Sequence, residues 1–187
     1  MNISRDIILK SDDGQLLLRP PLIDDAENIY NAVQVSKPEL MPWMDWCRPD
    51  FSLDVPIEWI KNQPQDWEQG INYQFLIFDN KSQQFLGGCG LNNINQYYLL
   101  ANLGYWVRSD RHREGIATEA TKRIALFGFQ KLGLRRIEIV TREENWASRR
   151  VAEKAGAVFE GILRKRIKLG DINVYAAMYS LIIEDLA

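Results

Sequence analysis

The feature that most constrains the fold of this chain is a strand-like run followed closely by a short polar loop and an amphipathic helix. The run is Leu103–Val107, and the loop, Arg111–Gly115, ends on a glycine. The helix is predicted by four apolar residues at helical spacing: Ile116, Ala120, Ile124 and Phe127. A helix that opens on such a loop presents unpaired backbone N–H groups and the positive end of its dipole at one point. The segment is therefore suited to hold a phosphate or pyrophosphate group.

Size and composition are those of an ordinary globular protein. The chain has 187 residues, of which 46% are hydrophobic and 26% charged, so a single domain over residues 1–187 is the economical interpretation. A net charge of −2 argues against a general nucleic-acid binder, and the basic cluster Arg164–Lys168 is most simply a solvated strand face. The amino terminus has no apolar signal core, and no run approaches the roughly 20 apolar residues of a membrane span. We therefore expect a cytoplasmic protein that contacts neither nucleic acid nor a membrane.

The cysteines and the histidine exclude several kinds of site. Cys47 and Cys89 give neither a disulfide framework nor metal-ligand spacing. His112 is the single histidine and lies inside the proposed phosphate loop, so neither a His-rich metal site nor a Ser-His-Asp triad is expected. We predict no metal and a reducing compartment.

The rest of the chain predicts strands and helices in alternation. Strands are predicted over Ile7–Lys10, Gln15–Arg19, Tyr73–Phe78, Gln84–Leu91, Tyr97–Val107 and Arg135–Thr141, with two more after Ala157 that a turn at Gly170-Asp171 joins. Besides the helix that begins at Ile116, helices are predicted over Asp24–Val35, Ile57–Gln69 and Ala147–Ala155. Pro64 should kink or divide the helix that contains it, and Ser36–Pro56 should be irregular. This order favours one α+β domain.

Three glycines, Gly87, Gly88 and Gly90, fall within one predicted strand. Glycine inside a strand indicates a bulge or a close approach of another backbone or of a ligand. A poorly packed edge strand is the alternative interpretation.

Two motifs carry a resemblance to a known family. The loop residues His112–Ala117 are similar to the Arg/Gln-x-x-Gly-x-Gly/Ala signature of the GNAT N-acetyltransferases. Gly115 and Ala117 match that signature, whereas His112 replaces the usual Arg or Gln. The segment Glu144–Gly161 resembles the family's Asn-x-x-Ser helix, with its following Glu-Lys-x-Gly and Glu-Gly elements.

The resemblance covers roughly residues 14–184 and is greatest to the RimJ/RimL subgroup, which acetylates the N-terminal amine of ribosomal proteins. The segment Ser36–Trp43 is similar to the part of that subgroup after its first helix. The resemblance implies a single GNAT-type α+β domain. Its central sheet would be mixed, mostly antiparallel and splayed, with about six to seven strands flanked by about four helices.

The resemblance also implies acetyl-CoA as co-substrate. In the family, main-chain groups at a splay between the fourth and fifth strands bind the pantetheine arm, and the glycine loop binds the pyrophosphate. The implied cofactor-binding residues are Trp106, Val107, Arg108, His112, Arg113, Glu114, Gly115, Ile116, Ala117, Thr118, Asn145, Ser148 and Arg149. For Arg149, a solvated helix face is equally consistent with the sequence.

Two residues are candidates for proton transfer. Ser148 lies in the first turn of a predicted helix and is the candidate general acid for the leaving thiolate; capping the helix or facing water is its alternative role. Glu138 is the candidate general base, with a structural ion pair as its alternative, because Asn102 stands where many relatives have an acid. An N-terminal amine has a pKa of about 8, so a missing base fits an α-amine acceptor better than a lysine or a polyamine.

The implied reaction is direct attack of a primary amine on acetyl-CoA in a ternary complex, with a ribosomal-protein N-terminus as the expected acceptor. Met41–Trp46 would lie over the acceptor side by its place in the family, where Asp45 could attract a cationic amine. Core packing or a homodimer contact is the alternative for this stretch. Two other functions stay open: acetylation of a small amine (polyamine, aminoglycoside or amino acid), and a non-catalytic CoA-binding regulatory domain.

Overall fold

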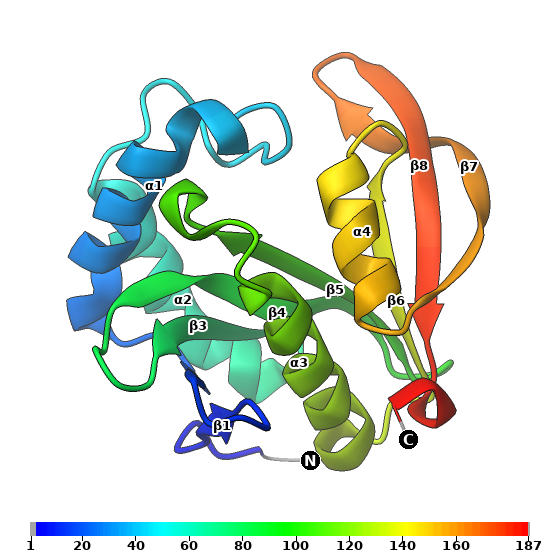
Figure 1. The fold of residues 1–187 in the computed structure, drawn as a ribbon, viewed down its shortest axis with the longest axis horizontal. Helices are drawn as coiled ribbons and strands as arrows, with labels where there is room; N and C mark the ends of the chain where they lie inside the picture. The colour runs from blue at the N-terminus through cyan, green and yellow to red at the C-terminus, as the bar shows by residue number, and fades with distance from the viewer. Residues whose placement is uncertain (1–2, 187) are drawn as a thin grey trace.

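The computed structural model describes residues 3–186 as one eight-stranded sheet with helices on both faces (Figure 1). The strand order is β1-β2-β3-β4-β5-β6-β8-β7. The strands are β1 Leu9–Lys10, β2 Leu16–Arg19, β3 Tyr73–Asp79, β4 Phe85–Asn95, β5 Leu100–Val107, β6 Arg136–Arg142, β7 Val158–Leu169 and β8 Ile172–Leu181. The helices are α1 Ala26–Leu40, α2 Asp54–Gln69, α3 Ile116–Leu132 and α4 Trp146–Lys154.

All neighbouring strands pair antiparallel except β5 and β6, which are parallel. This confirms the predicted α+β class and the mixed, mostly antiparallel sheet with four helices. The sheet has eight strands rather than six or seven because the two strands of the opening hairpin both join it.

Alternating side chains of β3 serve two apolar cores, one on each face of the sheet. Leu76 and Phe78 pack in the core that includes α1, whereas Phe75 and Ile77 pack in the core that includes α3. Ala152 of α4 belongs to the second core, and α3 and α4 lie side by side over that face. The sheet between the two layers is thus buried on both sides, which fixes it as the scaffold for the site.

Two helices run further than the sequence predicts. Helix α1 continues to Leu40 through Pro38, and α2 begins at Asp54 and runs undivided through Pro64, so the irregular stretch shrinks to residues 41–53. Tertiary packing explains the continuity of α2, because Ile60 and Trp67, on either side of Pro64, are both buried. Their burial outweighs the hydrogen bond that Pro64 removes.

Strand β5 is shorter than predicted, because residues 97 and 98 form a turn instead of extending it. The side chain of Asn95 accepts hydrogen bonds from the backbone N–H groups of Tyr97 (3.0 Å) and Tyr98 (2.9 Å). Such a side-chain acceptor closes a tight turn, so β5 starts only at Leu100.

The glycine run lies in a central strand, β4, between β3 and β5, so the edge-strand alternative is wrong. A Cβ on Gly90 would lie 2.6 Å from the carbonyl oxygen of Tyr73, and one on Gly88 would lie 2.9 Å from the indole nitrogen of Trp106. A register shift next to this run, between Ile77 and Phe78, marks a bulge. Close approach of neighbouring strands therefore explains the glycines.

The feature that positions the site is the separation of β5 from β6. These strands pair only from Leu100↔Arg136 to Asn102↔Glu138. Beyond this point β5 stays paired with β4 and β6 with β8, so the sheet opens between them. The predicted splay is therefore present, and it leaves the β6-facing backbone of residues 103–107 without a strand partner among residues 3–186.

Within the described residues, no helix is long and apolar enough to cross a membrane, and no group of three or more His, Cys, Asp and Glu side chains could hold a metal ion. Cys47 and Cys89 are buried and unbonded to each other.

Candidate active site

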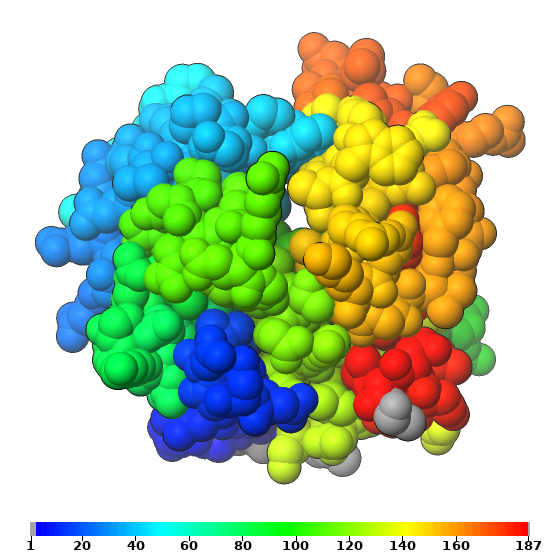
Figure 2. Space-filling view, in the orientation of Figure 1, coloured from blue at the N-terminus to red at the C-terminus, as the bar shows by residue number. Residues whose placement is uncertain are grey.

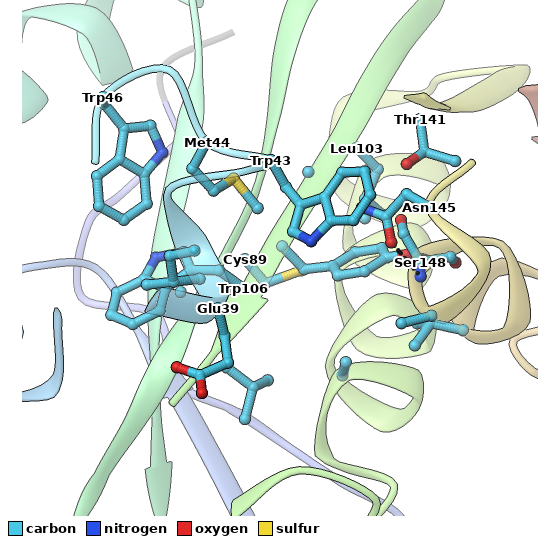
Figure 3. Close-up of a pocket in the computed structure, with 18 of the residues that line it drawn as sticks. Glu39, Trp43, Met44, Trp46, Cys89, Leu103, Trp106, Thr141, Asn145 and Ser148 are labelled. Atoms are coloured by element: carbon cyan, nitrogen blue, oxygen red, sulfur yellow. Dashed lines mark hydrogen bonds between the residues drawn. The ribbon is translucent and has the colours of Figure 1, made fainter. Parts of the chain in front are cut away.

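A cleft of about 1260 Å³ lies where the sheet opens (Figure 3). Its walls come from β5, β6, the N-terminal end of α3, α4, the C-terminal end of β7, and the segment between α1 and α2. We call this last segment, residues 41–53, the strap. A cleft of this size lined by apolar and a few polar side chains is the expected place for a ligand-binding site.

The loop that precedes α3 has the backbone that its glycine predicts. Gly115 is the N-cap of α3 with φ of +81°, and Arg113 also has a positive φ of +69°. A Cβ placed on Gly115 would meet nothing within 4 Å. The first N–H groups of α3 therefore open onto the cleft, as an anion site at a helix N-terminus requires.

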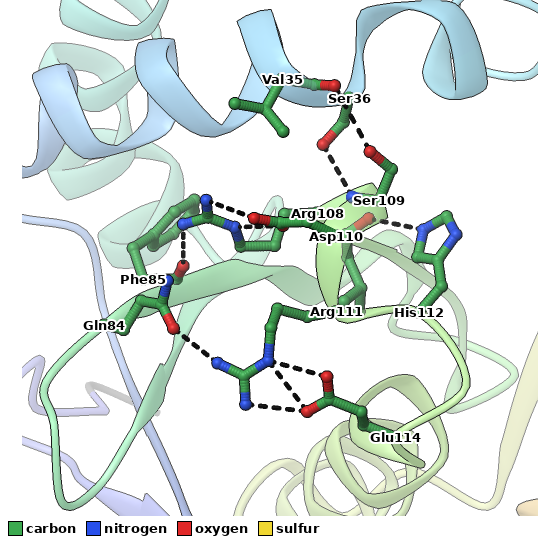
Figure 4. A network of polar contacts seen from close by, with 11 residues as sticks. Val35, Ser36, Gln84, Phe85, Arg108, Ser109, Asp110, Arg111, His112 and Glu114 are labelled. Atoms are coloured by element: carbon green, nitrogen blue, oxygen red, sulfur yellow. Dashed lines mark hydrogen bonds and ion pairs between the residues drawn. The ribbon is translucent and has the colours of Figure 1, made fainter.

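A polar network holds this loop in place (Figure 4). The backbone N–H of Ser109 donates to Ser36 Oγ of α1 at 2.8 Å, and Nε2 of His112 lies 3.1 Å from the carbonyl oxygen of Val107. Arg111 forms an ion pair with Glu114, and this hydrogen bonding lowers the pKa of the Glu114 carboxyl. His112 thus ties the loop to the end of β5.

Most of the implied cofactor-binding residues line the cleft. They are Trp106, Val107, His112, Arg113, Gly115, Ile116, Ala117, Thr118, Asn145 and Ser148. Three others do not line it. Arg108 is paired with Asp110, and Glu114 is paired with Arg111. Arg149 donates to the hydroxyl of Tyr179 at 3.1 Å and lies over the ring of Trp146.

Ser148 and Tyr105 meet across the opening in the sheet. The Tyr105 hydroxyl lies 2.9 Å from the Ser148 carbonyl oxygen and 3.1 Å from Ser148 Oγ. Asn145 Oδ1 accepts the Ser148 N–H at 3.0 Å, so Asn145 caps α4 and the Ser148 hydroxyl does not. Burial raises the pKa of the Tyr105 phenol, which keeps it protonated.

Glu138, the candidate base, lies outside the cleft lining and accepts a hydrogen bond from Arg136 Nε at 3.0 Å. The ion-pair alternative is therefore the geometry observed. Asn102, its parallel neighbour on β5, does line the cleft and donates to Asn92 Oδ1 at 3.0 Å. Asn102 Oδ1 is buried and has no hydrogen-bond partner within residues 3–186. The inner end of the cleft therefore holds two amide side chains, those of Asn102 and Asn92, at the position proposed for a general base.

The ion pair around Arg136 makes a pH-dependent contribution to stability. Hydrogen bonds from Arg136, with one from Ser180, hold the pKa of Glu160 at about 2. A depressed carboxyl pKa stabilises the fold above the ordinary glutamate pKa of about 4.3, and this stabilisation is lost as the pH falls towards 2.

We expect Glu160→Gln to lower the free energy of unfolding at pH 7, with the difference from wild type shrinking between pH 4.5 and 2. Urea unfolding at several pH values measures it. Glu68→Gln, at an exposed carboxyl without an ion pair among residues 3–186, is the control and should change little. A difference in the free energy of unfolding between Glu160→Gln and wild type that stays constant with pH would contradict a lowered pKa of Glu160.

The strap is fastened to the end of β6. Arg142 Nη1 donates to the carbonyl oxygen of Pro42 at 2.7 Å, and its guanidinium lies 4.7 Å from the centre of the Trp43 ring. Trp46 contacts the ring of Trp106 on β5 at 5.6 Å between centroids. Figure 3 shows strap side chains and Ser148 lining the same cavity. The aromatic stretch therefore forms a wall of the cleft.

Sequence reasoning missed Tyr105 and Arg142. Tyr105 stands in the quoted Leu103–Val107 run, but nothing in the sequence pairs it with a residue 43 positions away. Arg142 meets Pro42 across 100 positions. The sequence signal for Tyr105 is its place in an alternating strand pattern. Such a pattern does not by itself distinguish a side chain that lines the cleft from one that packs in the core.

Comparison with known proteins agrees with this architecture. Residues 15–158 match the model of the acetyltransferase (GNAT) domain. The uncharacterized N-acetyltransferase p20 of Bacillus licheniformis is 31% identical over 92% of this chain and 96% of its own length. The ribosomal-protein-serine acetyltransferase of Escherichia coli is 26% identical over 81% of this chain and 88% of its own length.

Among solved structures, RimL, a ribosomal-protein α-N-acetyltransferase in complex with coenzyme A, superposes with a TM-score of 0.86. It is 22% identical, and the match covers 96% of this chain and 99% of RimL, which supports the fold. The domain match spans well over half of the chain, and the strand–loop–helix and the splay lie inside it. The chain therefore belongs to the GNAT acetyltransferase family, whose members are acetyl-CoA-dependent acyltransferases.

Proposed function

We propose that this protein transfers the acetyl group of acetyl-CoA to the N-terminal α-amine of a protein, by direct attack in a ternary complex. A ribosomal protein is the expected acceptor class. The observation that carries the proposal is a single cleft that reaches from the Gly115 loop to the Tyr105–Ser148 pair. The acceptors named for the E. coli relative and for RimL are ribosomal proteins, which supports the acceptor class.

The cleft residues fit the co-substrate, which supplies an activated acetyl thioester. N–H groups from Gly115 to Thr118 would hold its pyrophosphate at the helix N-terminus. The unpaired backbone of residues 103–107 would bind the arm. The Arg108 N–H is not available for this, because it already donates to the Leu86 carbonyl oxygen at 2.9 Å.

Two contributions to rate come from the backbone. An N–H aimed at the thioester oxygen stabilises the charge that develops there, and one such donor is worth on the order of 10²–10³ in rate. Holding amine and thioester in one cleft also makes the attack effectively intramolecular. Neither contribution needs an unusual side chain.

Ser148 is the group proposed to donate a proton to the departing thiolate, and Tyr105 positions it. The Tyr105 hydroxyl has one proton and two acceptors in reach, the carbonyl oxygen and Oγ of Ser148. When this proton points to Oγ, the hydroxyl proton of Ser148 is free to leave towards the cleft. Because burial raises the pKa of the Tyr105 phenol and keeps it protonated, its hydroxyl has a proton to donate to either oxygen at neutral pH.

Among residues 3–186, no carboxylate lines the inner end of the cleft around Asn102, which favours an α-amine acceptor. Asn102 and Asn92 cannot take a proton at neutral pH, and the acids that line the cleft, Glu39 and Asp45, are exposed at its strap side. About a third of an α-amine is neutral at pH 7.5, but only about 0.1% of a lysine side chain. The orphan Asn102 Oδ1 could accept a hydrogen bond from the bound amine.

A panel of acceptors tests the proposal by release of CoA thiol from acetyl-CoA. We expect peptides with a free N-terminus to have a kcat/KM at least ten times that of polyamines, aminoglycosides and free amino acids. An N-terminally blocked peptide with lysine is the matched control and should be inactive. Preferred turnover of a small amine would favour the detoxification alternative, and binding of acetyl-CoA without turnover of any acceptor would favour the regulatory one.

A further inference from the structure

The basic cluster of the sequence forms a bulge in β7. The ladder with β8 pairs Leu163 with Ala176 and then Ile167 with Val174, so three residues of β7 stand opposite the single residue Tyr175. These three are exposed and basic: Arg164, Lys165 and Arg166. Lys165 has a φ of +54°, which is uncommon for a residue with a side chain. The bulge therefore displays three charges together at the sheet edge.

The bulge stands next to the mouth of the cleft. The residues that follow it directly, Ile167, Lys168 and Leu169, line the cleft together with the strap. Figure 1 shows the turn between β7 and β8 and the loop after α1 at the same end of the molecule. We call residues 164–168 the basic lip; its Ile167 and Lys168 line the same cleft as the strap, and its other three residues directly precede that lining in the chain.

The two sides of this mouth carry opposite charge. Glu39 and Asp45, the acids that line the cleft, lie at the end of α1 and on the strap. On the basic lip, Arg164, Lys165, Arg166 and Lys168 form no ion pair with any side chain among residues 3–186. The basic lip is thus uncompensated, although the chain as a whole carries a net charge of −2. Such a local excess attracts an oppositely charged partner.

We propose that the basic lip receives acidic side chains of the acceptor protein, a few residues after its N-terminal amine. The cationic amine enters beside the acidic strap, and the following acidic residues lie over the basic lip. The preferred acceptor is therefore a protein whose N-terminal segment carries Asp or Glu at about its third to sixth residue. This deepens the function proposed above and rests on it.

Three peptides that share their first two residues test the inference. Residues 3–6 are acidic residues in the first peptide, neutral amides in the second and free lysines in the third. For the wild type, we expect kcat/KM for the acidic peptide to exceed that of the neutral one by about ten-fold at low salt, with the basic peptide lower still. The preference should shrink towards unity as the salt concentration rises past about 0.5 M, because exposed charges are screened.

A charge-reversed variant, R164E/K165E/R166E, should prefer the basic peptide, with kcat for the neutral peptide and the Kd of acetyl-CoA changed less than two-fold. The matched control, K10E/K81E/K131E, changes the net charge equally at exposed lysines outside the cleft and should keep the wild-type order. Equal kcat/KM for all three peptides, or the same reversal in the control, would overturn the inference while leaving the proposed function standing. If no peptide is acetylated, the proposed function itself fails.

Discussion

Gly115→Asp is expected to abolish measurable binding of acetyl-CoA. Gly115 caps α3 with a positive φ and lines the cleft, and a Cβ there would meet nothing within 4 Å, so we expect the new carboxylate to fit beside the proposed pyrophosphate position. Like charges about 4 Å apart repel by about 4 kcal/mol at an effective dielectric constant of 20, so Kd should rise by a factor on the order of 10²–10³. Isothermal titration calorimetry of both proteins with acetyl-CoA measures the change.

The chain offers a matched control at the other end of the same helix. Gly133 caps the C-terminus of α3 with φ of +68°, and a Cβ there would also meet nothing within 4 Å. Gly133→Asp therefore carries a comparable backbone strain of roughly 1 kcal/mol without a charge near the cleft. It should bind acetyl-CoA as the wild type does. Unchanged affinity of Gly115→Asp would remove the loop from the cofactor site.

Ser148→Ala is expected to lower kcat by about 100-fold while the Kd of acetyl-CoA stays within two-fold, since a positioned general acid contributes at least about 10². The α4 cap should survive, because Asn145 Oδ1 accepts the backbone N–H of residue 148 and not its hydroxyl. Steady-state kinetics with a saturating peptide, beside calorimetry, separates the two quantities.

Tyr105→Phe should lower kcat about ten-fold, near the upper end for one hydrogen bond, if Tyr105 acts only through Ser148. The double variant should then be no slower than Ser148→Ala alone. Thermal melts of all three proteins exclude a loss of folded protein as the cause. If the double variant lowered kcat by the product of the two single effects, Tyr105 would act independently of Ser148. If Ser148→Ala left kcat unchanged, Ser148 would not be the general acid.

Local patterns predict the elements that bring the cleft together but not the contacts across it. The role of Gly115 could be predicted because it depends only on the local backbone conformation at the start of one helix. The length of α1 beyond Pro38 could not, since burial against distant residues overrides the local preference for a break. The turn at Asn95 was missed for another reason: an asparagine side chain supplies the turn hydrogen bonds where the apolar pattern still reads as strand.

In the candidate site, too, the sequence predicts individual residues but not the contacts between them. Alternation places Arg136 and Glu138 on one face of β6, opposite Ile137, but only the fold brings Glu160 to Arg136 and completes this ion-pair cluster. The Tyr105–Ser148 contact and the Arg142–Pro42 contact both join segments far apart in sequence. Such pairings depend on the splay of the sheet, which no local period encodes.

The central claim is acetylation of an N-terminal α-amine, and the most direct test is to locate the acetyl group on a product. A peptide with a free N-terminus and an internal lysine is incubated with the protein and carbon-13-labelled acetyl-CoA, then sequenced by tandem mass spectrometry. We predict the label on the α-amine alone, with none on the lysine and none in the Gly115→Asp reaction. Label on the lysine side chain, or no enzyme-dependent label on either amine, would contradict the account.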